Sequence, residues 1–308
     1  MERDHRELKR EDYVEPACSC DPGEFAKADR VKMIPQDRVV AKMNELMGRR
    51  DYDGCERLLK YWMDEAKLGA DLRGQLFLSN EMIGHYRKTG NREAAFAAIE
   101  QALGLIGTLS MEDTISAGTT YVNAGTACQA FSEPERAYEM FLKAEEIYEG
   151  TDSTGPQLLG GLYNNMALTC TALCRYSDAR ERYEKALVVM GRVPGGKLEQ
   201  AITYLNMADL VKAEKGMEAG EQEIYSLLDR AAVLLDVLPA PDGAAQLEAE
   251  VSGTLDCGEV SEAPDAPKDG YYAFVCEKCA PVFSYYGYFR VAEKLQKAAE
   301  EIYRESGA

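Results

Sequence analysis

The sequence predicts an all-α protein, a solenoid of about six antiparallel helix hairpins. The first observation behind this prediction is a set of alanines that recur every 42 residues, each followed by a second alanine seven residues later: Ala95 and Ala102, Ala137 and Ala144, Ala179 and Ala186. Small residues at i and i+7 share one face of a helix and let a neighbouring helix approach closely. A fixed period of this length is typical of helical repeats, in which each copy packs on the next.

The second observation is a pattern shared by three segments, Tyr121 to Cys128, Tyr163 to Cys170 and Tyr204 to Val211. Each segment begins with an aromatic residue and ends with Cys or Val. Ala or Met stands three positions after the aromatic residue, and Gly or Ala stands four positions after it. We expect each to be the first helix of a hairpin. The second helix follows a short turn, as in Arg136 to Ala144, where apolar residues recur at i, i+4 and i+7. Ser132 and Glu135 have the spacing of a capping box at its start.

The same pattern extends to both ends of the chain. The predicted hairpins span about 37–69, 71–108, 114–150, 156–192, 198–238 and 270–305, within a repeat domain over 36–308 that follows an N-terminal tail over 1–35. The first hairpin is a divergent end cap with Cys55 and Trp62 at the small-residue positions. The fifth carries an insertion around Gly216, and a linker rich in Pro, Gly and acids covers about 239–270. In the sixth, Pro281 should kink the first helix and Gly287 lies at the turn.

These residues resemble the tetratricopeptide repeat. Its second-helix pattern of alanine, aromatic and alanine is matched by Ala137, Phe141 and Ala144 and by the copy 42 residues later. The period is longer than the usual 34 residues, and is similar to the repeats of kinesin light chains and of bacterial peptide-pheromone receptors. The resemblance covers about 270 residues. It implies a right-handed superhelix whose first helices line a concave surface, and it implies binding of a protein or peptide without naming the ligand.

Charge narrows the class of partner. The chain has 53 acidic residues against 35 Lys and Arg, a net charge of −18. Such a charge repels nucleic acid and anionic membrane surfaces, so we expect neither as a partner. No apolar run reaches the roughly 18 residues of a membrane-spanning helix, and the first ten residues contain no apolar signal region. We therefore expect a cytoplasmic protein.

Catalytic and metal-binding patterns are scarce. Nine cysteines suit reduced thiols in the cytosol. A zinc site would need Cys18, Cys20, Cys276 and Cys279 together, which requires the tail to fold back onto the last hairpin. We expect no metal and no cofactor, and interpret Cys128, Cys170, Cys174 and Cys279 as small buried residues. The histidines are His5, in the tail, and His85, expected to be exposed or at an edge. The sequence thus predicts a protein that is not an enzyme.

The candidate binding residues are asparagines on the first helices. A helical rotation of 100° per residue places Asn123 roughly 150° or more from the packed face. The same position holds Asn165 and Asn206 in the next two repeats, and Asn80 and Asn164 stand one position earlier in theirs. Glu81 and Lys278 interrupt the series at its two ends. Further candidates along the same stripe are Thr119, Thr126, Leu168 and Asp209.

Two interpretations of these asparagines remain open. An amide offers a donor and an acceptor together, so it can bind the main chain of an extended peptide of any sequence, and asparagines of kinesin light chains act in this way. Alternatively, each asparagine bonds the adjacent first helix and keeps the repeats in register. The Lys and Arg that chaperone-binding members use to clamp a terminal carboxylate are replaced by Thr126, Leu168 and Asp209.

We therefore predict a non-enzymatic scaffold that binds a protein or an extended peptide. One alternative is a peptide-sensing regulator similar to the pheromone receptors, which would act through a separate output partner. Another, from a different class, is a metal-dependent or thiol enzyme built on the cysteine pairs.

Overall fold

The structure is a computed structural model that describes residues 31–239 and 268–306. In these residues all regular structure is helical, in eleven helices. They fall into two compact units, Met1–Ile147 and Tyr148–Ala308. The predicted tail up to residue 30 and almost all of the predicted linker lie outside the described residues.

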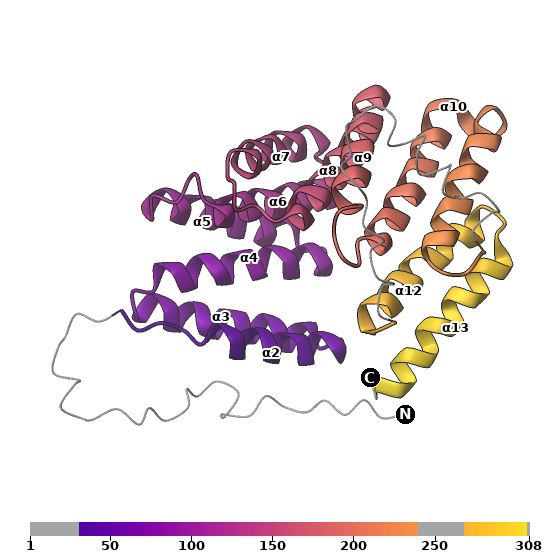
Figure 1. The fold of residues 1–308 in the computed structure, drawn as a ribbon. Coiled ribbons are helices and arrows are strands. Elements are labelled where there is room, and N and C mark those ends of the chain that lie inside the picture. Colours follow the sequence, from indigo (N-terminus) through magenta and orange to yellow (C-terminus); the bar gives the residue numbers. More distant parts are fainter. Residues whose placement is uncertain (1–30, 240–267, 307–308) are drawn as a thin grey trace. The chain divides into compact units, whose positions relative to one another are not determined.

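The first unit contains the first three hairpins (Figure 1). Its helices are α2 (Gln36–Gly48), α3 (Tyr52–Leu68), α4 (Leu72–Thr89), α5 (Arg92–Thr108), α6 (Ile115–Ala130) and α7 (Pro134–Glu149), of which the last ends two residues beyond the unit. Helix α4 packs on α3, α5 and α6, so a first helix contacts its own hairpin and both neighbours.

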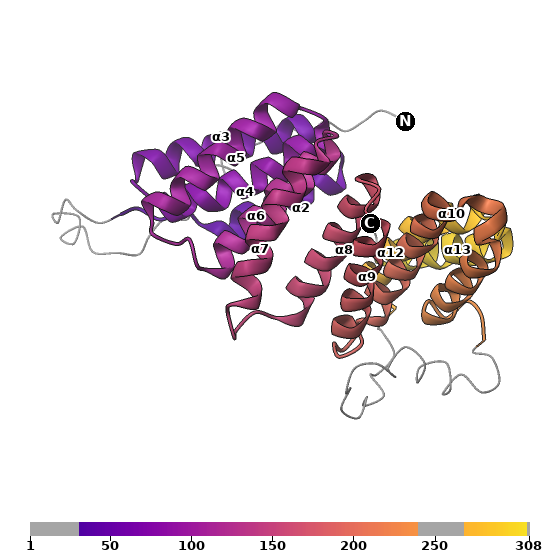
Figure 2. The ribbon, with the colours of Figure 1, turned by 90° about the horizontal axis from the view of Figure 1, so that it is seen from above.

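The second unit contains the remaining three hairpins (Figure 2). Its helices are α8 (Pro156–Ala172), α9 (Tyr176–Met190), α10 (Lys197–Leu234), α12 (Gly270–Tyr285) and α13 (Phe289–Ser306). Helix α10 is itself a hairpin, because Gly216 has φ 79° and ψ 172° and reverses the chain. The predicted all-α hairpin repeat is therefore confirmed. No helix among the described residues is both long and apolar enough to cross a membrane.

One turn recurs between consecutive helices and explains why the hairpins are tight. A residue with φ between +51° and +85° follows eight helices of the described chain, at Arg50, Ala70, Gly90, Ser110, Ser132, Cys174, Asp236 and Gly287. At Ala70 the N–H donates to Lys67 O (3.1 Å) and the next N–H, of Asp71, donates to Ala66 O (2.8 Å), which closes α3 as a Schellman motif. Asp71 Oδ1 then accepts from the Gly74 N–H (2.8 Å) and caps α4. A single residue thus ends one helix and begins the next.

The predicted capping box at Ser132 is wrong for the same reason. Helix α7 begins at Pro134, and Ser132 has φ 61°. Its N–H donates to Gln129 O (3.0 Å), so Ser132 closes α6 instead of opening α7.

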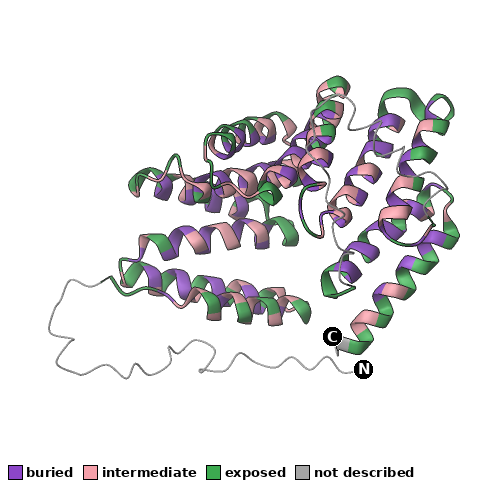
Figure 3. Cartoon of the chain, in the orientation of Figure 1, coloured by how far each residue is buried: buried purple, intermediate pink, exposed green. Residues whose placement is uncertain are grey.

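The repeated alanines lie where the sequence placed them, in the contact between the helices of each hairpin. All six have no exposed surface, and Cys55 and Trp62 are buried in the first hairpin. Buried residues line the facing sides of the helices in Figure 3. Gly125 lies in a close contact between α6 and α7, since an added Cβ would lie 2.4 Å from Cε1 of the buried Phe141. The core of each hairpin therefore depends on small residues at fixed positions.

A second repeated contact joins the two helices of three successive hairpins. The cations and rings are Lys143 over Tyr121 (5.3 Å to the centroid), Lys185 over Tyr163 (5.9 Å) and Arg230 over Tyr204 (5.9 Å). Each ring is the aromatic residue that the sequence pattern marked in a first helix. The contact covers one edge of the hairpin with a cation–π pair.

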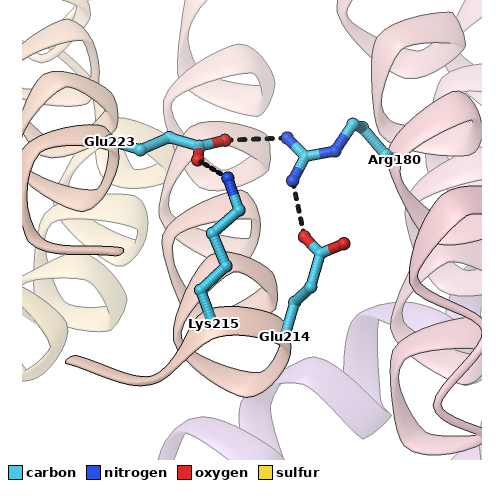
Figure 4. Close-up of polar contacts among 4 residues, drawn as sticks. All are labelled: Arg180, Glu214, Lys215 and Glu223. Atoms are coloured by element: carbon cyan, nitrogen blue, oxygen red, sulfur yellow. Dashed lines mark hydrogen bonds and ion pairs between the residues drawn. The ribbon is translucent and has the colours of Figure 1, made fainter. Parts of the chain in front are cut away.

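An ion-pair cluster ties α9 to both halves of α10 beside the Gly216 turn (Figure 4). Arg180 Nη1 lies 2.9 Å from Glu223 Oε1, and Nη2 lies 2.8 Å from Glu214 Oε2. Lys215 Nζ contacts the other oxygen of Glu223 at 2.6 Å. The cluster fixes the hairpin that carries the predicted insertion to its neighbour.

The segment before α2 is held in place although it is not helical. The Lys32 N–H donates to Gly69 O (3.0 Å), and the Ile34 N–H donates to Asp71 Oδ2 (3.0 Å). A Cβ on Gly69 would lie 2.5 Å from Lys32 O, so glycine is needed there. The turn between α3 and α4 is thereby covered.

Two side chains differ from the sequence prediction. His85 is buried, with 5% of its surface exposed, because it lies at the contact of α3 and α4 beside Tyr86. Cys174 is exposed, because it occupies the left-handed turn position at the end of α8 rather than a helix face.

Helix α12 continues through Pro281 as one helix, and the predicted kink stays a prediction.

Candidate functional site

The predicted binding residues lie on first helices in both units. Those of the first unit are Asn80, Thr119, Asn123 and Thr126, on α4 and α6, and those of the second are Asn164, Asn165, Leu168, Asn206 and Asp209, on α8 and α10. Most are half-buried. Asn164 is buried, whereas Leu168 and Asp209 are exposed.

In the first unit the structure brings two of the asparagines together. Asn80 Nδ2 donates to Thr120 Oγ1 (3.0 Å) and to Leu76 O (3.0 Å), and Asn80 Oδ1 accepts from Asn123 Nδ2 (2.8 Å). Both N–H groups of Asn80 are thus used within the chain. Asn123 keeps a carbonyl oxygen and one N–H without a partner in the described residues. Asn80 therefore holds α4 and α6 in register, while Asn123 retains capacity for a ligand.

The second unit repeats one of these three hydrogen bonds. Asn164 Nδ2 donates to Thr203 Oγ1 (2.9 Å), as Asn80 does to Thr120. Asn164 Oδ1 is buried without a partner among the described residues. Asn206, the counterpart of Asn123, is half-buried and its amide makes no hydrogen bond in that part of the chain. The asparagine series therefore contains both register contacts and unused amides.

The other candidate residues differ in their hydrogen bonds and in their exposure. Thr119 and Thr126 donate to the main-chain oxygens of Ile115 and Asn123 in their own helix. Leu168 exposes 40% of its surface, an apolar side chain open to contact. Asp209 accepts from the O–H of Tyr286 (2.6 Å), the residue that follows α12, and so joins α10 to the end of that helix.

The sequence prediction did not include a pocket at the amino-terminal ends of α8, α10 and α12. The pocket has a volume of about 500 Å³ and lies within the second unit. Its lining is mostly apolar or glycine, from Gly161, Met190, Val193, Gly195 and Leu198. Tyr271, Glu199 and Asp269 add one ring and two carboxylates.

Exposed aromatic residues continue from this pocket along α12. Tyr271 and Phe274 expose 47% and 45% of their surfaces and stack with ring centroids 6.3 Å apart. Further along the same helix, Tyr285 is 64% exposed and has Lys212 Nζ 4.4 Å from its ring centroid. The sequence carries a signal for this surface, because Lys278 occupies the asparagine position of the sixth hairpin and Phe274 lies one helical turn before it.

The two carboxylates of the pocket are held by α12. Glu199 Oε1 accepts from the Tyr271 O–H. Asp269 Oδ1 caps α12 by accepting from the N–H groups of Tyr271 (2.9 Å) and Tyr272 (3.1 Å). Desolvation by burial, together with the neighbouring carboxylate of Glu199, raises the pKa of the Tyr271 hydroxyl. The second oxygen of each carboxylate has no partner in the described residues.

The thiols of α12 are buried and protonated. Burial raises the pKa of Cys279 to about 12 and also raises that of Cys276. Among the described residues no three His, Cys, Asp or Glu side chains are arranged to hold a metal ion. Cys18 and Cys20, the other half of the zinc hypothesis, lie outside the described residues.

No family model and no curated protein matches the chain. Three similar solved structures are the kinesin light chain nearly identical TPR-like repeats of Podosopora anserina (16% identity, 74% of this chain and 94% of that chain, TM-score 0.41), BtubC (BKLC) from P. vanneervenii (17%, 90% and 94%, TM-score 0.43) and MamA protein (14%, 73% and 98%, TM-score 0.38). The structures that this chain is similar to thus include TPR-like repeats, as the sequence resemblance predicted.

Proposed function

We propose that this protein is a non-enzymatic scaffold that binds a protein partner through an extended peptide segment lying on its first helices. The observation that carries the proposal is the pair of equivalent asparagines, Asn123 and Asn206. Both are half-buried and keep hydrogen-bonding groups that the described chain does not use. Half-buried amides that the chain leaves unused at the same position of two repeats are available to a ligand.

The chemistry of a peptide main chain suits these groups. An extended segment presents alternating N–H and C=O groups, and one amide can bond both. Exposed apolar side chains on two other first helices, Leu168 on α8 and Phe274 on α12, supply contacts for the side chains of the ligand. The main-chain hydrogen bonds then accept a peptide of any sequence, and the apolar contacts select among its side chains.

Net charge limits the partner. At −18 the chain repels phosphate backbones and anionic lipid, and attracts proteins with basic segments. We therefore propose a protein ligand in the cytoplasm, without nucleic acid or membrane as a direct partner.

The test compares two asparagines that differ in their bonds. Short random peptides are displayed on phage and selected on the purified protein, and the selected peptides are synthesised and labelled. Asn206→Ala should weaken their binding roughly tenfold, because one or two hydrogen bonds to the ligand are lost, and should leave thermal unfolding unchanged. Asn164→Ala is the matched structural variant, since it removes the bond to Thr203. Loss of stability but not of binding in Asn206→Ala would contradict the proposal.

A further inference from the structure

We propose that the pocket between the amino-terminal ends of α8, α10 and α12 receives an arginine side chain of the bound peptide, held between the Tyr271 ring and the carboxylates of Glu199 and Asp269. The inference rests on the proposed function and adds a subsite that selects the ligand.

The pocket has the size and walls that a long, partly apolar side chain needs. Its volume of about 500 Å³ exceeds that of one side chain, so part of the adjoining peptide also fits. Met190, Val193 and Leu198 are buried and form an apolar wall suited to the methylene stem of arginine.

The ring at the pocket is exposed and backed by a second ring. Tyr271 and Phe274 stack with an interplanar angle of 22°, and each leaves nearly half of its surface open. A planar guanidinium stacks on such a ring face by cation–π contact. The aromatic rings of α12 take cations in this way within the chain, since Lys278 Nζ lies 5.5 Å from the Phe274 centroid.

The charge of the pocket selects a cation. Both charged residues in its lining are acids, Glu199 and Asp269. Each has one carboxylate oxygen bonded to α12 and one without a partner in the described residues. Two free carboxylate oxygens match the several N–H donors of a guanidinium. The net charge of −18 favours the approach of a basic segment.

Gly161 provides a variant that closes the pocket without changing its charge. It lines the pocket from α8, and a Cβ added there would meet no atom within 4 Å. Gly161→Leu therefore fills the space from the inside without a clash at its own backbone. Gly104→Leu is the matched control, because Gly104 is exposed on α5 and its Cβ also meets nothing within 4 Å.

The experiment uses fluorescent peptide pools with one fixed central residue and mixed flanking residues. The central residue is arginine, citrulline, lysine or glutamate. Citrulline has the shape of arginine without its charge, which separates fit from charge. Binding to the full chain is measured by fluorescence polarisation at moderate salt. The arginine pool should bind roughly tenfold more tightly than the citrulline pool, because a charge-assisted contact is lost. Gly161→Leu should abolish this preference and Gly104→Leu should keep it.

The outcomes separate the two proposals. Equal binding of arginine and citrulline pools, or an arginine preference that survives Gly161→Leu, overturns the arginine subsite. If all pools then still lose affinity in Asn206→Ala, the proposed function stands without it. If no pool binds the wild-type chain at all, the proposed function is contradicted as well.

Discussion

Gly125→Ala is the sharpest test of how the hairpins pack. A Cβ at this position would lie 2.4 Å from Phe141 Cε1 and 2.7 Å from Cδ1 and Cζ, and the ring has no exposed surface into which it can retreat. Overpacking of a buried site costs about 1 to 3 kcal/mol. Replacing glycine by alanine inside a helix normally stabilises by about 1 kcal/mol. The net result should be a loss of stability, the opposite of what helix propensity alone predicts.

Thermal unfolding followed by circular dichroism measures this difference. Gly104→Ala is the control, because Gly104 is exposed and a Cβ there meets no atom within 4 Å. The midpoint should fall for Gly125→Ala and rise slightly for Gly104→Ala, by about 2 to 4 °C per kcal/mol for a unit of this size. Adding Phe141→Leu to Gly125→Ala should restore part of the loss. Equal upward shifts for both alanine variants would refute the packing described for this hairpin.

Two further variants test the first helices of the first unit. Asn80→Ala removes three hydrogen bonds between and within helices and should destabilise by about 1 to 3 kcal/mol, whereas unchanged urea unfolding would show that these bonds do not set the register. Glu81→Gln tests a half-buried carboxyl, because desolvation raises the pKa of Glu81 in the folded chain. The folded state then binds the proton more tightly, so the stability that Glu81 contributes is present below its ordinary pKa and lost as the pH rises through the raised value. The glutamine variant should be more stable than wild type at neutral pH and equal to it at acid pH, and an unchanged difference across this range would refute the assignment.

The all-α hairpin architecture could be predicted because it rests on residues that act locally or at a fixed period. Ala137 and Ala144 share one helix face because they are seven residues apart, and both are buried, as predicted. Gly287 has φ 85° at the expected turn. The left-handed turns at Ser132 and Cys174 could not be predicted from the sequence, because neither residue is a glycine. Their positive φ is seen only in the folded backbone.

The candidate site was harder to predict because it depends on neighbouring helices. The angle that placed Asn123 away from its own hairpin was informative, yet its bond to Asn80 depends on how α4 and α6 are rotated against each other. The pocket draws on residues up to 114 positions apart, from Gln157 to Tyr271, and no sequence period links them. Whether the two units form the single predicted domain, with a right-handed superhelix, stays a prediction.

The most direct test of the central claim is site-specific photo-crosslinking of a selected peptide. A photoreactive phenylalanine analogue is placed at Leu168, 40% exposed on the first helix α8, or at Tyr225, 36% exposed on the second half of α10. Both positions belong to the second unit and are similarly open, so they differ mainly in which helix of a hairpin carries them. The account predicts efficient crosslinking from Leu168, competed by unlabelled peptide, and none from Tyr225. Crosslinking from Tyr225 with none from Leu168 would contradict binding on the first helices.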